Sequence, residues 1–239
     1  MLKGKTIVIT GATSGIGEAI ARVCAREGAR AVIGYRRNET AARALAEELG
    51  GVARYLDVRA PDSIAAACEP FLEGQIQGWV NNAAIHLPGL LPTVSDAMIE
   101  EQIETNLLGP IRCCRFILPH MMEHRQGSIV NIGSVTRERV HPGQAVYAAT
   151  KGGVAALTRA LACEYARMGI RVSCVEPGPE DTAMLEEGRK RAGARLTESI
   201  PMRRIGAPSE IAELVAFLLS DRASYMTGGL YSADGGYSL

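Results

Sequence analysis

A regular alternation of two kinds of segment limits the folds open to this chain. Short runs of β-branched and other apolar residues are separated by longer, alanine-rich segments with helical periodicity. Runs that are apolar at successive positions are typical of strands buried on both faces, and parallel strands require helical crossovers. The pattern therefore predicts an α/β fold with a doubly wound, mostly parallel sheet of seven strands. The expected strands are residues 6–10, 31–35, 52–56, 78–81, 128–132, 171–175 and 229–232.

Helices are expected between these strands. The chain shows no internal repeat, low-complexity stretch or linker, so residues 1–239 are expected to form a single domain. In a doubly wound sheet, right-handed crossovers place the ligand site at the carboxyl ends of the strands. The expected helices are residues 17–27, a segment ending at Leu49, 62–72, 96–124, 147 to just before Gly169, and 210–220.

Charge and apolar content exclude several classes of partner. The 26 basic and 26 acidic residues give a formal net charge of zero, which offers no electrostatic footprint for nucleic acid or an anionic membrane. The longest good apolar run, Leu214–Leu219, is far shorter than the roughly 20 residues of a membrane span. The N-terminal residues lack the layout of a signal peptide. We therefore expect a cytoplasmic protein that acts on a small molecule.

The six cysteines give no sign of a metal site. They form no CxxC motif and have no metal-ligand spacing with the four histidines, so no metal is expected. Cys24, Cys68 and Cys163 lie among alanines in helical patterns, where cysteine is typically a small packing residue. A reactive thiol is the alternative.

A glycine-rich turn joins the first expected strand to the first expected helix. In residues 10–17 (TGATSGIG), Gly11 suits a tight turn, Gly15 close backbone approach, and Gly17 the packing of helix on strand. The N-terminus of the following helix offers free amides and a partial positive charge to a pyrophosphate. Glycines also serve ordinary turns, but a position after a strand and before a helix favours dinucleotide binding.

The end of the second expected strand bears on which dinucleotide is bound. An acidic residue about 20 positions beyond the glycines would bind a ribose 2′-hydroxyl and indicate NAD. The residue at the corresponding position is Tyr35, followed by Arg36 and Arg37, and the first carboxylate is Glu39. Two guanidinium groups suit a 2′-phosphate, so NADP (NADPH) is predicted over NAD. The alternative is a pair of arginines on an exposed loop.

Ser134, Tyr147 and Lys151 form a candidate catalytic group. Ser134 follows the strand expected at 128–132, and Tyr147 lies one helical turn before Lys151, on the same helix face. Lowering the pKa of a tyrosine from near 10 by about 3 units takes roughly 4 kcal/mol. The Lys151 ammonium and the positive ring of an oxidised nicotinamide are expected to supply it, so that Tyr147 exchanges a proton with a substrate oxygen held by Ser134. Alone, such a Tyr–Lys pair is most often a helix-surface pair.

Together these motifs resemble those of the short-chain dehydrogenase/reductase superfamily over nearly the whole chain. The order and spacing of the motifs are more specific than any one of them. The resemblance implies a single-domain Rossmann fold and a nicotinamide-dependent oxidoreductase. The matching residues are 10–17, Asp57 and Val58, 81–84 (NNAA), Asn106, Ser134, 147–151 (YAATK), and Pro177 and Gly178.

The resemblance also implies a role for each matching position. Tyr147 is expected to be the general acid/base, Ser134 the hydroxyl that orients the carbonyl, and Lys151 the group that adjusts the tyrosine pKa and binds the nicotinamide ribose. Asn106 is expected to hold a water that connects Lys151 to solvent. The implied cofactor-binding residues are Gly11, Thr13, Ser14, Gly15, Ile16, Gly17, Tyr35, Arg36, Arg37, Asp57 (on the adenine amino group), Val58, Asn82, Ala83, Ala84, Tyr147, Lys151, Pro177, Gly178 and Thr182 (on the carboxamide).

Three positions depart from the family's pattern. Ala84 stands where glycine is common, and Ser14 stands where NADP enzymes often have a basic residue. The NADP prediction therefore depends on Arg36 and Arg37 alone. Glu176 stands where asparagine or another small residue is usual, and its carboxylate is expected either beside the substrate pocket or at the sheet end.

Within the superfamily, the chain is most similar to 3-oxoacyl-[acyl-carrier-protein] reductases and related ketoreductases. Such reductases dock their carrier protein on basic residues, and the matching positions here are Ser128 and Met168, with Arg125, Arg167 and Arg171 close by. The resemblance therefore does not support acyl carrier protein as a partner, and a free ketone, a coenzyme A thioester or a biosynthetic intermediate stays open. The similar residues are 131–135 (NIGSV), 143–147 (GQAVY), 200–204 (IPMRR), 225–229 (YMTGG) and 234–236 (DGG).

The substrate pocket is expected beside Ser134, under residues 179–200. This polar, charged stretch is expected to be a lid that excludes water, with an ordinary surface hairpin as the alternative. His86 and His141 receive no catalytic role, because a lone loop histidine is more often only exposed. The expected substrate-binding residues are Ser134, Val135, His141, Gln144 and Met184, with His86, Leu87, Leu91, Val140 and Leu185 also lining the pocket.

The leading hypothesis is an NADPH-dependent reductase that converts a ketone, such as a 3-oxoacyl thioester, to a secondary alcohol. The alternatives are an NAD(P)-dependent alcohol dehydrogenase that works oxidatively and a non-catalytic dinucleotide-binding sensor. The complete catalytic set argues against the sensor. The resemblance also implies a homotetramer, with the helices at 96–124 and 147–168 packing across one interface and the strand near Tyr231 at another.

Overall fold

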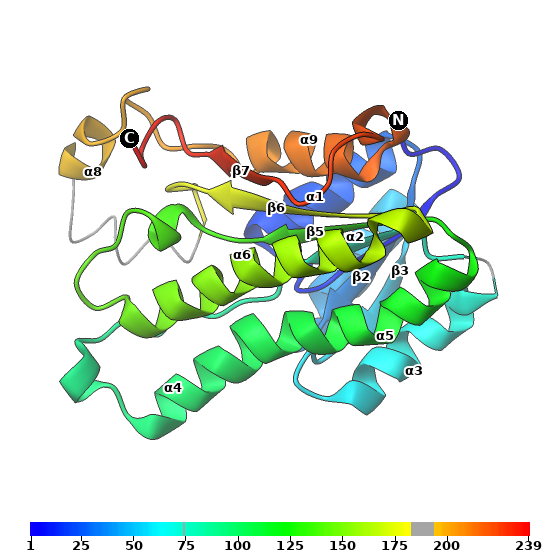
Figure 1. Ribbon diagram of the computed structural model, residues 1–239, viewed down its shortest axis with the longest axis horizontal. Helices are drawn as coiled ribbons and strands as arrows, with labels where there is room; N and C mark the ends of the chain where they lie inside the picture. The colour runs from blue at the N-terminus through cyan, green and yellow to red at the C-terminus, as the bar shows by residue number, and fades with distance from the viewer. Residues whose placement is uncertain (74, 183–193) are drawn as a thin grey trace.

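The computed structural model describes residues 1–73, 75–182 and 194–239, and in these residues seven strands form one sheet (Figure 1). The strand order is β3-β2-β1-β4-β5-β6-β7, so the order reverses between β1 and β4. Every neighbouring pair is parallel, which confirms the predicted doubly wound α/β fold. The strands are β1 Thr6–Ile9, β2 Arg30–Tyr35, β3 Val52–Tyr55, β4 Gly78–Asn81, β5 Gly127–Ile132, β6 Ile170–Pro177 and β7 Leu230–Ala233.

Helices cover both faces of the sheet (Figure 1). Helices α1, α2 and α9 pack on one face, and α3, α5 and α6 pack on the other. No helix in the described part of the chain is long and apolar enough to cross a bilayer. The helices are α1 Gly15–Arg26, α2 Glu39–Leu49, α3 Pro61–Leu72, α4 Asp96–Ile103, α5 Gly109–Glu123, α6 Ala145–Tyr165, α8 Ala194–Glu198 and α9 Pro208–Leu219.

Two apolar layers form because successive side chains of a strand point to opposite faces of the sheet. In β1, Ile7 and Ile9 enter the layer shared with α1, α2 and α9, whereas Val8 enters the layer shared with α3, α5 and α6. All three side chains are fully buried. The two layers explain why the strand segments are apolar at successive positions.

The helix predicted at 96–124 is not continuous. Its path consists of α4, a π-helical turn at Glu104–Leu108, and α5. Such turns shift the hydrogen bonding by one residue, change which side chains face the core, and are frequent at functional sites. Asn106 lies within this turn and is buried. No residue type in the stretch marks a π turn, so the sequence predicted an unbroken helix.

The cysteine prediction is confirmed in part. Cys24 and Cys68 are buried, and burial raises the pKa of each thiol to about 12. Cys163 is exposed on α6, so the prediction that it is a packing residue was wrong. Helix α6 has alanines at both buried and exposed positions, so alanine neighbours do not distinguish its two faces.

Buried polar side chains form a hydrogen-bonded relay between the sheet and α6. The Trp79 indole N–H donates to Asn81 Oδ1 (2.8 Å), and Asn81 Nδ2 donates to Asn131 Oδ1 (2.8 Å). Asn131 Nδ2 then donates to the Thr158 hydroxyl (2.9 Å), which donates to the Val154 carbonyl (2.9 Å). The relay links β4, β5 and α6. Because hydrogen bonds are directional, it fixes the rotation of α6 against β5.

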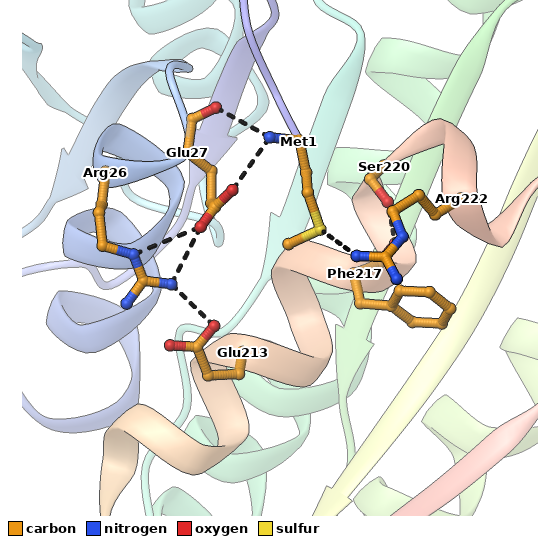
Figure 2. Close-up of polar contacts among 7 residues, drawn as sticks. All are labelled: Met1, Arg26, Glu27, Glu213, Phe217, Ser220 and Arg222. Atoms are coloured by element: carbon orange, nitrogen blue, oxygen red, sulfur yellow. Dashed lines mark hydrogen bonds and ion pairs between the residues drawn. The ribbon is translucent and has the colours of Figure 1, made fainter.

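Polar contacts near the N-terminus join α1 to α9 (Figure 2). The Met1 ammonium lies 2.9 Å from the Glu27 carboxylate. Arg26 pairs with Glu27 (3.1 Å) and with Glu213 of α9 (2.8 Å), and Arg222 lies 3.3 Å from the Met1 sulfur. Ion pairs of this partly exposed kind contribute only about 0–1 kcal/mol each. The buried apolar side chains shared by α1 and α9 therefore hold these helices together.

Truncation of Asn131 tests the relay. Asn131→Ala removes a donor and an acceptor from a buried position, and should lower the free energy of unfolding by about 2–4 kcal/mol in urea denaturation. Thr158→Val should lower the free energy of unfolding by about 1–3 kcal/mol, because the Asn131 amide then lacks its acceptor. The double variant should lower the free energy of unfolding by less than the sum of the two single effects, since Asn131 and Thr158 share one hydrogen bond. Additive losses would contradict a coupled relay.

Candidate active site

The carboxyl ends of β1 and β4, where the strand order reverses, are joined by Thr10 and Asn82. The Thr10 hydroxyl donates to the Val80 carbonyl (3.3 Å) and accepts the N–H groups of Asn82 and Ala83 (3.0 Å each). The Asn82 amide donates to the carbonyls of Thr10 (3.0 Å) and Gly11 (2.9 Å). Asn82, predicted to line the cofactor, thus braces the glycine-rich turn at the point where open α/β sheets bind ligands.

The glycine-rich turn leaves the first turn of α1 open to an anion. Gly11 and Gly15 have φ angles of +63° and +55°, and a Cβ on Gly17 would lie 2.4 Å from the Gly11 carbonyl oxygen. Ser14 is the N-cap residue, but within the described residues its side chain makes no capping hydrogen bond. Open amides and the helix dipole together favour phosphate binding. The turn therefore fits the pyrophosphate of a dinucleotide.

The remaining predicted cofactor residues lie beside this turn or at the carboxyl ends of other strands. A Cβ on Gly15 would lie 3.1 Å from the Thr182 methyl group, so Thr182 lies beside the turn. The Gly178 N–H donates to the Ala233 carbonyl (3.1 Å) at the end of β7. Val58 is buried in the apolar layer under β3. Thr13 and Ile16 belong to the turn and α1, whereas Ala83 and Ala84 follow β4 and Pro177 ends β6.

Arginines gather where β2 and β3 end. Strand β2 ends at Tyr35, so Arg36 and Arg37 begin the next loop, Arg36 half-buried and Arg37 exposed. The Asp57 carboxylate accepts hydrogen bonds from Nη2 (2.6 Å) and Nε (3.0 Å) of Arg59. The Arg59 guanidinium holds the pKa of Asp57 below its ordinary value, and Arg36 acts in the same direction. The carboxylate predicted to bind adenine is thus already paired, with an arginine that the sequence analysis missed.

The structure brings Ser134, Tyr147 and Lys151 together. Lys151 is only 4% exposed, and its ammonium donates to the Ile132 carbonyl at the end of β5 (2.7 Å). The same nitrogen lies 5.5 Å from the centroid of the Tyr147 ring. Ser134 follows two residues after Ile132, within hydrogen-bonding reach of the Tyr147 phenol, and its hydroxyl donates to that of Thr136 (2.9 Å).

Burial determines the protonation of the tyrosine and the lysine. It raises the pKa of Tyr147 to about 12, and the hydrogen bond with Ser134 acts in the opposite direction. Burial lowers the pKa of Lys151 to about 8, so the ammonium form still predominates at pH 7. The predicted lowering of the tyrosine pKa is therefore not produced by this chain alone, because the ammonium bonds Ile132 rather than the phenol. Tyr147 is a protonated phenol, the form that donates a proton to a carbonyl oxygen.

Two carboxamides, one helical turn apart, fix the chain after β4. Asn106 accepts the Ile85 N–H and donates to the Ile85 carbonyl (2.8 Å each). Gln102 makes the same pair of bonds with Leu87 (3.2 and 3.3 Å). Between them, His86 packs edge-to-face on the candidate tyrosine, with ring centroids 4.9 Å apart. The Asn106 side chain thus places His86, and its water-holding role stays a prediction.

The predicted substrate-binding residues have different surroundings. Gln144 lies at the N-cap of α6, and its Oε1 is buried with no hydrogen-bond partner in the described part of the chain. Val135 is buried against Ile200 and Tyr237, and His141 bonds the Tyr237 hydroxyl. Leu91 and Val140 are exposed, whereas Met184, Leu185 and half of the predicted lid at 179–200 lie outside the described residues.

Glu176, one of the departures from the family's pattern, forms a buried ion pair. The side chain is 2% exposed, and its carboxylate accepts hydrogen bonds from Nε (2.8 Å) and Nη2 (3.1 Å) of Arg137. Arg137 belongs to the short helical turn Val135–Arg137, directly after Ser134. Since Glu176 lies near the end of β6, the pair ties this strand end to the segment that follows the candidate serine.

A family model described as Enoyl-(Acyl carrier protein) reductase matches residues 11–238. The chain is 40% identical over 254 residues to oxidoreductase UcpA of Escherichia coli (strain K12), with 100% of this chain and 96% of the relative covered. It is 38% identical over 239 residues to 3-oxoacyl-[acyl-carrier-protein] reductase FabG of Vibrio cholerae serotype O1, with 98% of each covered.

The fold is also similar to that of solved structures. One is the crystal structure of 3-ketoacyl-(acyl-carrier-protein) reductase from Brucella melitensis complexed with NADH. It superposes with a TM-score of 0.93 at 34% identity, and the match covers 100% of both chains. This full-length similarity confirms the predicted single-domain Rossmann fold.

Separating the buried ion pair should destabilise the protein strongly. Arg137→Met leaves the Glu176 carboxylate buried without its partner, and should lower the free energy of unfolding by about 3–5 kcal/mol. Combining it with Glu176→Leu should restore most of this loss, because no buried charge remains. Glu138→Gln is a matched control, since this exposed carboxylate also lies 2.6 Å from Arg137. If urea unfolding shows that Arg137→Met lowers the free energy of unfolding no more than Glu138→Gln does, the stabilising role of the Arg137–Glu176 pair is refuted.

Proposed function

Because the chain belongs to the short-chain dehydrogenase/reductase superfamily of oxidoreductases, we propose that it reduces a ketone to a secondary alcohol with NADPH as its cofactor. The superfamily acts on CH–OH or C=O groups with a nicotinamide dinucleotide. The observation that carries the proposal is the cluster of Ser134, Tyr147 and Lys151 at the carboxyl edge of the sheet, on the same edge as the open glycine-rich turn.

The protonated Tyr147 phenol suits a general acid. A reduced nicotinamide supplies the hydride that such a reduction needs. As the carbonyl carbon is reduced, negative charge develops on its oxygen, which the Ser134 hydroxyl would hold while Tyr147 donates its proton. The Lys151 ammonium, held by the Ile132 carbonyl, lies 5.5 Å from the phenol ring and would stabilise the phenolate left behind.

The arginines after β2 support NADPH over NADH. Arg36 and Arg37 directly follow Tyr35, which stands where an NAD enzyme would carry a carboxylate. Asp57, which follows β3, is paired with Arg59 and so does not oppose a 2′-phosphate with a free negative charge. NADH is the alternative, supported by the NADH complex of the Brucella melitensis relative.

A thioester or small ketone is the proposed substrate class. The name of the Vibrio cholerae relative supports a 3-oxoacyl thioester. The buried, unpartnered oxygen of Gln144 among the described residues supports a polar substrate group near Ser134. Arg171 donates to the carbonyls of Leu218 (2.6 Å) and Ser220 (3.0 Å), which leaves less of its guanidinium for a carrier protein. We therefore propose a free rather than a carrier-bound substrate.

A homotetramer in which α4 and α5 contribute to an interface is part of the proposal. Ile103 of α4, and Ile111 and Met122 of α5, are large apolar side chains that are each 36% exposed. Partly exposed apolar side chains on neighbouring helices support an interface with another copy of the chain. The cytoplasmic location and the lid at 179–200 stay predictions.

The first test is NADPH oxidation by the purified protein with a panel of ketones that includes a 3-oxoacyl thioester. Turnover of the thioester with NADPH preferred over NADH would support the substrate and cofactor proposals together. Reduction of another ketone alone would keep the mechanism and change the substrate class. Failure to reduce any ketone with either cofactor would refute the proposed function.

Tyr147→Phe tests the general acid. The variant keeps the ring that contacts His86 but lacks the proton, so kcat/KM should fall by about 10²–10⁴-fold while NADPH affinity changes by less than about threefold. Stopped-flow turnover and cofactor fluorescence titration measure the two quantities. Tyr165→Phe, at the other end of α6, is the matched control. A Tyr147→Phe enzyme with nearly normal turnover would rule out this mechanism.

Replacing both arginines after β2 tests the cofactor. Without two charge-assisted bonds to the 2′-phosphate, Arg36→Ala with Arg37→Ala should raise the KM for NADPH by about ten- to a hundredfold and change the KM for NADH by less than about twofold. Arg43→Ala is the control, because Arg43 is exposed on α2 and paired with Glu39. An equal rise in the KM for NADPH and the KM for NADH would contradict recognition of the 2′-phosphate.

A further inference from the structure

Residues 234–239, which follow β7, lie against the candidate substrate site. In Figure 1 the C-terminus lies next to α8. Tyr237 is central to the contacts of this tail, because its side chain is only 7% exposed and packs with Val135 and Ile200 in a small apolar cluster. Val135 directly follows the candidate serine. The tail therefore touches the active-site loop, defined here as residues 135–144, between Ser134 and α6.

The tail is anchored where β6 and β7 end. The Asp234 carboxylate accepts the N–H groups of Gly236 (2.9 Å) and Ser238 (2.7 Å), which closes a turn around Tyr237. A Cβ on Gly178 would lie 2.6 Å from the Asp234 Cβ, so the turn packs closely against Gly178, which is predicted to lie beside the nicotinamide. The position of Tyr237 is thus fixed by the same strand end that carries Pro177 and Gly178.

Tyr237 binds the active-site loop at two points. The Arg139 guanidinium lies 4.1 Å from the centroid of the Tyr237 ring and also donates to the Tyr237 carbonyl. His141 Nε2 lies 2.7 Å from the phenol oxygen. Within the described chain, no carboxylate forms an ion pair with Arg139, so Tyr237 provides its principal contacts. Cation–π contacts of this kind are most stabilising when they are partly desolvated.

The tail also binds the segment opposite the loop. The Met202 N–H donates to the Gly235 carbonyl (3.1 Å), and Ile200 is almost fully buried beside Tyr237. The Tyr237 side chain therefore lies between residues 200–202 and the active-site loop. Removing the Tyr237 side chain would separate these two segments.

We propose that Tyr237 is a positioning residue of the substrate site: it holds the active-site loop, and with it Ser134 and Gln144, against residues 200–202. This inference rests on the proposed ketone reduction. His141, predicted to bind substrate, then acts through Tyr237. The short helical turn Val135–Arg137 is tied to β6 by the Glu176 ion pair, whereas Tyr237 fixes the part of the loop that follows. A displacement of about 1 Å in such a loop is enough to reduce turnover substantially.

Three variants of the full chain test this role. Tyr237→Ala removes the ring and the hydroxyl, Tyr237→Phe removes only the hydroxyl that meets His141, and Leu239→Ala is a control on a 99% exposed side chain of the same tail. Kinetics with the ketone reduced best by the unmodified enzyme separate kcat from KM, and fluorescence titration gives the Kd of NADPH. Hydrogen–deuterium exchange of residues 135–144 reports on the loop independently of activity.

Tyr237→Ala should lower kcat/KM for the ketone by about ten- to a hundredfold, leave the NADPH Kd within about twofold, and speed amide exchange at Glu138 and Arg139. Tyr237→Phe should recover most of the activity, because the ring still packs on Val135 and Arg139. Kinetics and exchange indistinguishable from Leu239→Ala would overturn the proposal. If Tyr237→Ala does not fold, faster exchange in Tyr237→Phe at Gln144, whose N–H donates to the His141 carbonyl (3.2 Å), supports the proposal and unchanged exchange overturns it.

The exchange measurement also separates this proposal from the proposed function. A protein that reduces no ketone but shows faster loop exchange in Tyr237→Ala would refute the function and keep the structural role of Tyr237. An active protein whose Tyr237→Ala variant matches the control would refute only the positioning role.

Discussion

The orientation of α6 against β5 is the constraint on which the candidate site depends. Apolar contact brings a helix and a sheet together, but it does not select one rotation of the helix. Here buried hydrogen bonds select it: Asn131 of β5 binds Thr158, and the Ile132 carbonyl binds Lys151 two turns earlier on the same helix face. Tyr147, one turn before Lys151, is thereby carried to Ser134. The geometry of the proposed chemistry thus follows from bonds that lie in the core.

Several side chains that the sequence predicts to bind ligands also support the site from within the protein. Asn82 braces the glycine-rich turn, Asn106 fixes the backbone that carries His86, and Asp57 is paired with Arg59. Each of these polar groups is satisfied inside the protein, so it does not need to reorganise when a ligand binds. The other groups proposed to meet a ligand are of a different kind: the backbone amides of α1, the Tyr147 phenol and the buried Gln144 oxygen.

The sequence predicted what depends on local pattern and missed what depends on distant pairing. Strands apolar at successive positions, and the glycine-rich turn between β1 and α1, carry their signal within about 10 residues. The ion pair of Arg137 with Glu176 and the contact of Arg139 with Tyr237 join residues 39 and 98 positions apart. A charged residue gives no local sign of its distant partner. The π turn at Asn106 was missed for a different reason, since no residue type in Glu104–Leu108 marks such a turn.

The basic residues of the active-site loop also have partners within the protein. Arg137 is neutralised by Glu176 and Glu138, and the positive charge of Arg139 lies over the Tyr237 ring. His141 shares a hydrogen bond with the same tyrosine. Glu176 and Glu138 therefore neutralise Arg137 inside the protein, whereas an aromatic ring does not neutralise a guanidinium, so Arg139 keeps its positive charge. The ring and the carbonyl of Tyr237 hold that charge in one place. The same contacts that fix the loop thus also fix where its positive charge lies.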